Sequence, residues 1–267
     1  MSTAELRYHR YSFFEYRTLG TSLFMDPAFS RYRRGAWVGS GVVDRCDIVA
    51  VTSGDFDHYC DAIDVLLGHD PQLVASVDIC RAIWEHIERK YGTRHLNKHH
   101  FIGLEDQESA NNGRLRLTGY RVEPWRLQQL WLDFLRRPED ITRLGATLRR
   151  TPQHADGLAF VIEMAGRRIA HLGCALHPKT NWSDIRTIAS GGVDLVVCSA
   201  NADYVEELVR GVSILAPSQL VLYKGRMAIE GRIGVQRASL GEFEEAVRDR
   251  YPGVEVTVLS PGSARPL

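Results

Sequence analysis

Three side chains that can bind a metal ion or move a proton lie within four positions of one another. They are Asp55, Asp57 and His58, in the loop that runs from Thr52 to His58. Carboxylate and imidazole groups are ligands for divalent metals, and both can also serve as general bases. The spacing therefore predicts a site for metal binding or acid–base chemistry in this loop.

A strand must position the loop. Residues Val42 to Val51 are expected to form it, and their last part, Ile48 to Val51, is apolar and β-branched. A short run of this kind is typical of a strand in the core of a sheet. Thr52-Ser53-Gly54 ends the apolar run, so the loop is expected directly after a core strand.

The remaining pattern alternates between strands and helices. Further strands are expected at Leu6 to Arg17, Thr21 to Met25, Leu73 to Ser76, Arg114 to Val122, Leu158 to Met164, Arg168 to Leu172, Asp194 to Cys198, Gln219 to Tyr223 and Val254 to Leu259. Helices are expected at Asp61 to Leu67, from a cap at Asp78 to Lys90, at Tyr204 to Leu215 and at Leu240 to Tyr251. This mixture favours a layered α/β sandwich over a simple doubly wound sheet. We expect one domain, 1–267, with a helical insert at about 127–150 that Pro138 splits.

Composition excludes several classes of protein. The 33 basic and 33 acidic side chains balance, which argues against an electrostatic nucleic-acid binder. The N-terminal residues lack the apolar core of a signal peptide, and no window reaches the length of a membrane span. The five cysteines are odd in number and scattered, so we expect free thiols and a cytoplasmic location.

Five segments, in order along the chain, resemble the metallo-β-lactamase superfamily. The resemblance is to its ascorbate-6-phosphate lactonase-like and N-acyl-phosphatidylethanolamine phospholipase D-like branch. The segments are Phe24 to Ser30, Asp47 to Thr52 with the loop that follows, Gly157 to Gly173, Val193 to Val197, and Leu215 to Val221. The resemblance implies a four-layer αββα sandwich, with one or two metal ions held between the two sheets.

Carried over position by position, the ligand set of that family is incomplete here. The family signature at the loop is Thr-His-x-His-x-Asp-His, and Ser53 and Asp55 stand in place of its first two histidines. Asp57 and His58 are intact. Cys174 stands where the metal-bridging aspartate normally stands, and a thiolate is a strong zinc ligand.

Two further ligand positions of the family differ as well. His154 could be the histidine that precedes the strand from Gly157, but a second alignment puts this position at Glu123 to Trp125, which holds no ligand. The last family histidine is replaced by Tyr223-Lys224.

The resemblance therefore implies one metal ion. It would be bound by Asp57, His58 and Cys174, with Asp55 or His154 as the fourth ligand. Zinc is the first choice, and a set richer in oxygen favours iron or manganese.

Two hypotheses on function follow. The first is a divergent metal-dependent hydrolase that acts on a small ester, lactone or phosphoester through a metal-activated water. Asp55 would bind the metal or act as general base, and Lys224 or Tyr223 would stabilise the oxyanion. The expected binding partner of such a hydrolase is a small-molecule substrate. The sequence does not decide whether the protein forms a homo-oligomer.

The second hypothesis is a pseudoenzyme of the same fold, without a metal, that serves in binding or assembly. A large exposed apolar patch would mark its partner surface. Two plainer interpretations remain beside both hypotheses: the loop carboxylates only cap the next helix, and Cys174 is only a buried thiol.

Overall fold

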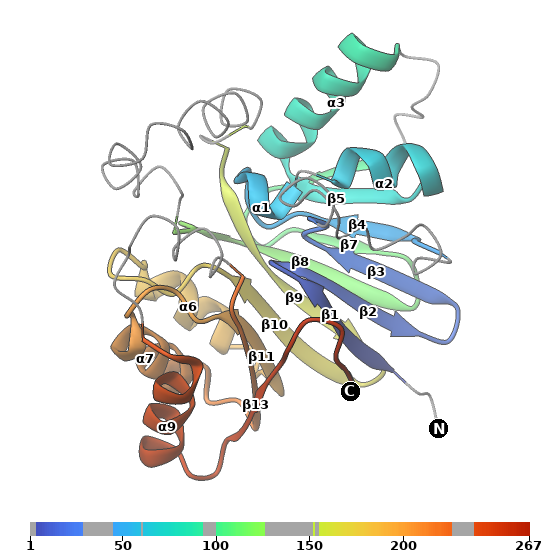
Figure 1. Ribbon diagram of the computed structural model, residues 1–267. Helices are drawn as coiled ribbons and strands as arrows, with labels where there is room; N and C mark the ends of the chain where they lie inside the picture. Colours follow the sequence, from blue (N-terminus) through green and yellow to red (C-terminus); the bar gives the residue numbers. More distant parts are fainter. Residues whose placement is uncertain are drawn as a thin grey trace.

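Two sheets pack face to face, with helices on both outer sides (Figure 1). The computed structural model describes residues 4–28, 45–59, 61–92, 100–125, 152, 155–225 and 238–267. For residues 56 and 57 it describes the backbone alone. The expected insert at about 127–150 lies outside the described residues.

The first sheet has seven described strands. Their order across the sheet is β14 (Ala264–Pro266), β1 (Glu5–Arg10), β2 (Phe13–Thr18), β3 (Thr21–Met25), β4 (Ile48–Ala50), β5 (Gln72–Ser76) and β6 (Phe101–Leu104). The strands from β14 to β3 pair antiparallel. From β3 to β6 the pairs are parallel, so these four strands end at the same edge.

The second sheet also has seven described strands. Their order is β13 (Glu255–Val258), β12 (Gln219–Tyr223), β11 (Leu195–Ser199), β10 (Arg167–Gly173), β9 (Gly157–Met164), β8 (Leu115–Val122) and β7 (Ser109–Asn111). The strands β10 to β13 pair parallel, and β7 to β10 antiparallel. The strands β10, β11 and β12 therefore also end side by side.

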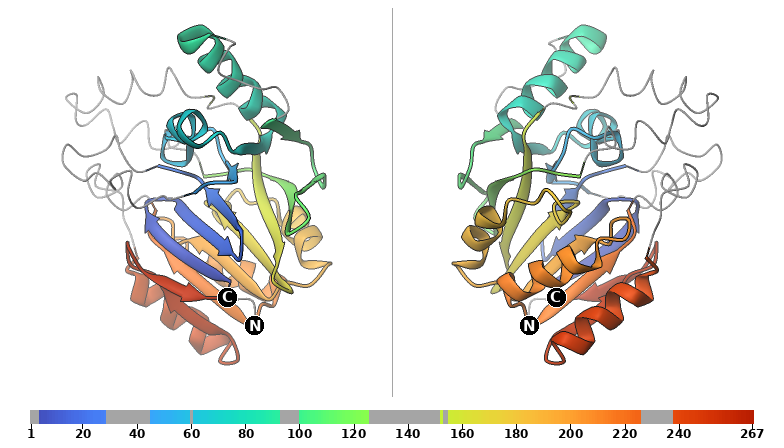
Figure 2. Two further views of the ribbon diagram at one scale, coloured as in Figure 1. Left: turned by 90° about the vertical axis from the view of Figure 1, so that its right-hand side faces the viewer. Right: turned by 90° about the vertical axis from the view of Figure 1, so that its left-hand side faces the viewer.

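Helices cover the outer face of each sheet, and the views of Figure 2 show them on opposite sides of the molecule. On the first sheet lie α1 (Phe56–Tyr59), α2 (Ala62–His69) and α3 (Val77–Tyr91). On the second lie α6 (Trp182–Ala189), α7 (Val205–Leu215) and α9 (Leu240–Arg250). The order helix, sheet, sheet, helix confirms the αββα sandwich that the sequence predicts.

The side chains of β9 pack alternately into two different layers of the core. Leu158, Phe160 and Ile162 belong to the core between the sheets. Ala159 and Val161 alternate with them and pack toward the helices of the second sheet. This period of two is the pattern of a strand that is buried on both faces.

Three local features differ from the predictions. The expected strand from Leu6 to Arg17 is a hairpin, because Tyr11 takes a left-handed conformation with φ 53° and reverses the chain between β1 and β2. The helix expected to be capped by Asp78 is capped by Ser76, whose hydroxyl accepts the Ile79 N–H, so that prediction was wrong. The short strands β6, β7 and β14 and the helix α6 were not predicted.

No helix among the described residues is long and apolar enough to cross a membrane.

Phe160 tests how much the core between the sheets contributes. Its side chain is fully buried between the two sheets, so Phe160→Ala is expected to lower the free energy of unfolding by about 3–5 kcal/mol. Leu19→Ala is the control, because Leu19 is 71% exposed, and is expected to change it by less than about 0.5 kcal/mol. Urea unfolding measures both, and losses of equal size would contradict this account of the core.

Candidate active site where the two sheets meet

The Asp26 carboxylate is the anchor of the site. Asp26 follows β3 with φ 52°, a left-handed conformation that aspartate tolerates better than most residues. Its Oδ1 accepts the Thr52 N–H at 2.7 Å, and its Oδ2 accepts the Thr52 hydroxyl at 2.7 Å. The carboxylate is fully buried, and these bonds fix its direction.

His58 is held by this carboxylate. Its Nδ1 lies 2.8 Å from Asp26 Oδ2 and 3.0 Å from the Thr52 hydroxyl oxygen. A carboxylate only accepts hydrogen bonds, so the network places the proton of neutral His58 on Nδ1. The other ring nitrogen, Nε2, then carries a lone pair and can accept a proton.

Cys174 faces this nitrogen from the other sheet. It comes directly after β10, and its Sγ lies 3.5 Å from His58 Nε2. The Ser12 hydroxyl oxygen lies 3.4 Å from the same nitrogen. Both the imidazole and the thiol are buried, the thiol with 2% of its residue surface exposed. The sequence thus brings together two residues 116 positions apart, a thiol and an imidazole that is oriented by a carboxylate.

Gly173 allows this close approach. It has φ +56°, and a Cβ built on it would lie 3.2 Å from Thr52 Oγ1 and 3.7 Å from a carbon of the His58 ring. A side chain at this position would therefore press on Thr52, which binds the Asp26 carboxylate, and would touch the His58 ring.

Polar atoms without a hydrogen bond gather at the strand ends of the second sheet. In the described part of the chain, the Ser199 and Tyr223 hydroxyls and Asn201 Oδ1 are buried and make none. Ser199 ends β11 and Tyr223 ends β12, and the two residues are directly paired. Most buried polar groups in proteins find a partner, so a cluster of such atoms indicates a place for a ligand or water.

Tyr223 lies close to the thiol. Burial raises the pKa of its hydroxyl well above the usual range, and its closeness to Cys174 and Asp26 adds to this effect. The phenol is therefore protonated and able to donate a hydrogen bond.

His171 is a second buried histidine near the Asp26 carboxylate, and it is uncharged at neutral pH. Its Nδ1 and the Tyr16 hydroxyl oxygen are hydrogen-bonded at 2.7 Å, and this bond joins the two sheets. Its Nε2 lies 4.0 Å from Asp26 Oδ2. Burial lowers the pKa of His171 to about 4; the Asp26 charge opposes this shift and His58 adds to it.

Comparison with known proteins agrees with this architecture. A family model described as a β-lactamase superfamily domain matches residues 5–221, which is most of the chain. The chain belongs to the metallo-β-lactamase superfamily. No curated protein matches the sequence.

Several solved structures share the fold at low sequence identity. A novel metallo hydrolase from the archaeon Ignicoccus hospitalis is 15% identical with a TM-score of 0.67, over 99% of this chain and 98% of that one. An isothiocyanate hydrolase from Delia radicum gut bacteria is 14% identical with a TM-score of 0.61, over 98% of both chains. CmlA, a diiron β-hydroxylase from Streptomyces venezuelae, is 13% identical with a TM-score of 0.60, over 100% of this chain and 54% of that one. At these identities the likeness shows the fold.

The predicted site residues are only partly brought together. His58 and Cys174 are in contact, and Tyr223 is their neighbour. The Lys224 ammonium donates to the Ala238 carbonyl at 3.0 Å. Asp55 is buried in the loop after β4, where its N–H donates to the Ser53 hydroxyl.

Two of the predicted metal ligands, the Asp57 side chain and His154, lie outside the described residues. The chain on either side of His154 packs on the loop, since Ala155 N–H donates to the Pro152 carbonyl and that carbonyl contacts Gly54. The alternative position for the third histidine, Glu123 to Trp125, lies near Cys174, because the Trp125 N–H donates to the Cys174 carbonyl at 3.0 Å. The two alignments of the third histidine therefore both stay open.

A catalytic zinc needs three protein ligands, and the described residues do not provide them. The pair His58 and Cys174 would suit one zinc ion, because bonds of about 2.0 and 2.3 Å at a tetrahedral angle put nitrogen and sulfur about 3.5 Å apart. Among the described residues, however, no three His, Cys, Asp or Glu side chains lie close enough together to hold a metal, and Asp55 does not join the pair. The described donors thus do not fit the metal centre of the superfamily.

Asp26, Thr52 and Ser12 are site residues that the sequence did not reveal as such. In the sequence, Asp26 stands out only as a member of the matching segment Phe24 to Ser30. The signal available in the sequence was its position directly after the strand expected at Thr21 to Met25.

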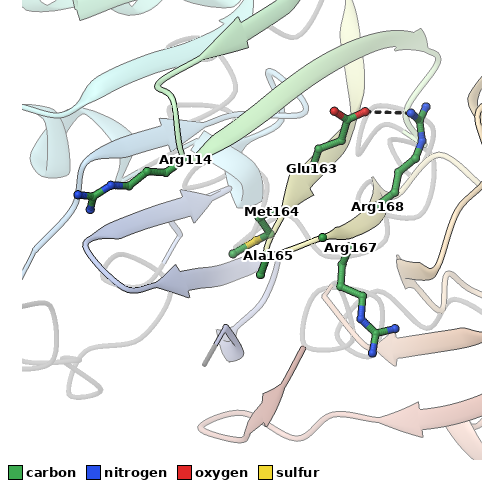
Figure 3. A pocket seen from close by; sticks show the side chains of 7 residues that line it. Arg114, Glu163, Met164, Ala165, Arg167 and Arg168 are labelled. Atoms are coloured by element: carbon green, nitrogen blue, oxygen red, sulfur yellow. Dashed lines mark hydrogen bonds and ion pairs between the residues drawn. The ribbon is translucent and has the colours of Figure 1, made fainter. Parts of the chain in front are cut away.

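A separate hollow of about 360 Å³ lies at the turn between β9 and β10. Figure 3 shows its arginines, Arg114, Arg167 and Arg168, the last paired with Glu163 at 2.9 Å. It lies at the start of β10, whereas Cys174 follows the end of that strand, so the hollow does not belong to the candidate active site.

His171 predicts how stability depends on pH. Its pKa in the folded protein is about 4, below the ordinary value of 6.5, so protons bind preferentially to the unfolded chain between these values. The free energy of unfolding is expected to fall as the pH is lowered from 6.5 toward 4, with up to about 1.4 kcal/mol per pH unit from this group. His171→Asn, which keeps an acceptor for Tyr16, is expected to show a smaller slope in denaturant titrations. Equal slopes would contradict the buried, neutral state of His171.

Gly173→Ala is expected to destabilise the protein more than Gly166→Ala. Both glycines have positive φ, which costs alanine about 1–2 kcal/mol, but around Gly166 the described residues leave space for a Cβ. At Gly173 the new methyl group would meet Thr52 Oγ1, which Asp26 and His58 hold in place, and about 1 kcal/mol or more should be added. Chemical denaturation compares the two variants, and equal losses would show that Thr52 can move aside.

Proposed function

We propose that this protein is a hydrolase of a small ester, lactone or phosphoester, and that His58 and Cys174 are the centre of its site. The observation that carries the proposal is the contact between them. A buried imidazole, oriented by Asp26, presents Nε2 to a buried thiol at the edge where parallel strands of both sheets end. An oriented base beside a nucleophile is an arrangement that catalyses hydrolysis on many unrelated folds.

The surroundings of the pair support a ligand site. The Tyr223 hydroxyl and the nearby Ser199 and Asn201 oxygens are buried and make no hydrogen bond to other described residues. A substrate with polar oxygens would supply partners for them. The proposed role of Tyr223 as donor to an oxyanion agrees with its protonated state.

A bound metal ion is a more specific part of this proposal. The superfamily resemblance implies one ion on Asp57, His58 and Cys174, with Asp55 or His154 as fourth ligand and Asp55 as the alternative general base. Bound there, a metal would lower the pKa of a water molecule. His58 and Cys174 support this ligand set, and the described residues supply no third donor, so we derive no step through a metal.

The substrate class and the branch of the superfamily are also proposals. The lactonase-like and phospholipase D-like branch would supply lactones and phosphoesters as substrates. The fold is shared by an isothiocyanate hydrolase and by a diiron β-hydroxylase, so fold alone does not select among these.

The alternative hypothesis is a pseudoenzyme, for which a large exposed apolar patch is expected. The described residues give little support to such a patch. Among the described residues, the large apolar side chains that are exposed are Leu19 and Val77, which lie on different elements and form no patch with other apolar side chains there. A binding or assembly role is therefore kept as an outcome of the experiment below.

Activity and metal content test the proposal together. Protein purified without added metal is analysed for zinc, iron and manganese, and assayed with nitrophenyl esters, simple lactones and nitrophenyl phosphate. We expect hydrolysis of at least one class, and a decrease of about 10²- to 10⁴-fold in His58→Gln. His100→Gln is the control, because His100 pairs with Asp70 at the surface and should behave as wild type.

The metal analysis separates the alternatives. About one equivalent that is lost in Asp57→Ala/His58→Ala would support the mononuclear site. If no substrate class is hydrolysed, with or without added metal, the hydrolase proposal fails and the pseudoenzyme is favoured.

A further inference from the structure

We infer that Cys174 is a nucleophile, that His58 is its general base and that Asp26 positions His58, so that ester cleavage proceeds through a thioester on Cys174. This inference rests on the proposed function and specifies its chemistry. It also narrows the substrate to a compound with a reactive carbonyl, namely an ester, lactone or thioester.

The first argument is the order of the three groups. Asp26 Oδ2 lies 2.8 Å from His58 Nδ1, and the opposite ring nitrogen, Nε2, lies 3.5 Å from Cys174 Sγ. A nucleophile, a base within reach of it, and a third group that orients the base form the arrangement by which thiols and hydroxyls are activated on unrelated folds.

The second argument is the direction of the proton. Asp26 accepts hydrogen bonds from both Thr52 groups and from His58 Nδ1, which leaves the lone pair of neutral His58 on Nε2. The thiol proton can therefore move directly to Nε2. The charge that the ring then gains lies beside the buried carboxylate, which stabilises it.

The third argument is a group that can stabilise an oxyanion. Tyr223 ends β12 with its hydroxyl buried near Cys174, and this hydroxyl makes no hydrogen bond to the other described residues. A phenol hydroxyl can donate to the oxygen of a tetrahedral intermediate. The site thus supplies a donor as well as a nucleophile and a base.

The reaction balances with water as the only co-reactant. The Sγ–H proton passes to His58 Nε2, and the sulfur forms a bond to the carbonyl carbon. The C–O bond to the alcohol breaks, and the alcohol oxygen takes the proton from Nε2. A water molecule then gives a proton to Nε2 and its oxygen to the thioester carbon. The C–S bond breaks, the acid leaves, and the proton returns to sulfur.

The departures from the family signature agree with chemistry that uses no metal. The family histidines at positions 53 and 55 are serine and aspartate here, the last one is replaced by Tyr223-Lys224, and the bridging aspartate is a cysteine. Among the described residues, which do not include the Asp57 side chain or His154, no third His, Cys, Asp or Glu joins His58 and Cys174. The same two groups need no further ligand to act as base and nucleophile.

Trapping of the covalent intermediate tests the inference. The full-length protein is dialysed against a chelator, its metal content is confirmed to be negligible, and it is mixed with nitrophenyl acetate. We expect a burst of about one nitrophenol per protein and an acetyl group on Cys174, located by peptide mass spectrometry. Cys174→Ser, checked for folding by circular dichroism, should lose the adduct. Cys80→Ala is the matched control, because Cys80 is a buried thiol on α3 outside the site.

The roles of His58 and Asp26 need separate measurements. His58→Gln should slow the acylation of Cys174 by about 10²-fold or more. Asp26→Asn should also slow it and, because an amide can donate to Nδ1, should move the ring proton of His58 from Nδ1 to Nε2. Nitrogen-15 NMR of labelled histidine reports this change, which loss of stability alone would not cause.

Each outcome separates the inference from the proposed function. If the metal-free protein gives no adduct on Cys174, or if His58→Gln acylates as fast as wild type, the inference is overturned. Ester hydrolysis that returns only with added metal would then keep the proposed function. An adduct on Cys174 that forms once and is not turned over would support the nucleophile and overturn the hydrolase.

Discussion

The structure of the site depends on one buried negative charge. A carboxylate that is removed from water is stable only when donors surround it, and Asp26 receives two hydrogen bonds from Thr52 and a third from His58. These bonds hold the loop after β4 against the end of β3. They also fix the His58 ring, and so decide which nitrogen faces the second sheet. The left-handed backbone at Asp26 is a local strain that these contacts maintain.

Each sheet contains a parallel part, so neighbouring strands end together at one edge. The strands β3 to β6 end together in one sheet, and β10 to β13 in the other. The backbone N–H of Leu158 donates to the Thr52 carbonyl at 2.8 Å, and the Tyr16 hydroxyl reaches His171 across the core. Polar side chains that follow strands of different sheets are therefore brought within hydrogen-bond distance, while the apolar core lies beneath them.

Much of the fold could be predicted from the sequence, and the reasons are local. The strands β3 and β9 and the helix α7 carry clear apolar patterns, and their observed bounds agree with the expected ones within a residue. The hairpin at Tyr11 was missed because a left-handed tyrosine leaves no signal in the pattern of apolar residues. The strands β6, β7 and β14 are three or four residues long, too short for a period to be seen.

The site was harder to predict than the fold. The sequence indicated that His58 and Cys174 belong together only through the resemblance, because 116 positions separate them. It could not show that Asp26 orients the imidazole, since that depends on the parallel pairing of β3 and β4. The resemblance implied that His58 binds a metal ion, whereas in the structure its Nδ1 is hydrogen-bonded to Asp26 and Thr52 and its Nε2 faces Cys174.

The order of the strands along the chain has a consequence for biosynthesis. The strands β1 to β6 precede every strand of the second sheet, and only the edge strand β14 of the first sheet comes later. A growing polypeptide therefore emerges from the ribosome with most of the apolar inner face of the first sheet before the strands that pack on it. The face is covered only when β8 to β12 have been made. Until then the nascent protein exposes strand surface that favours association with other chains, and its correct maturation depends on how quickly the later half is translated.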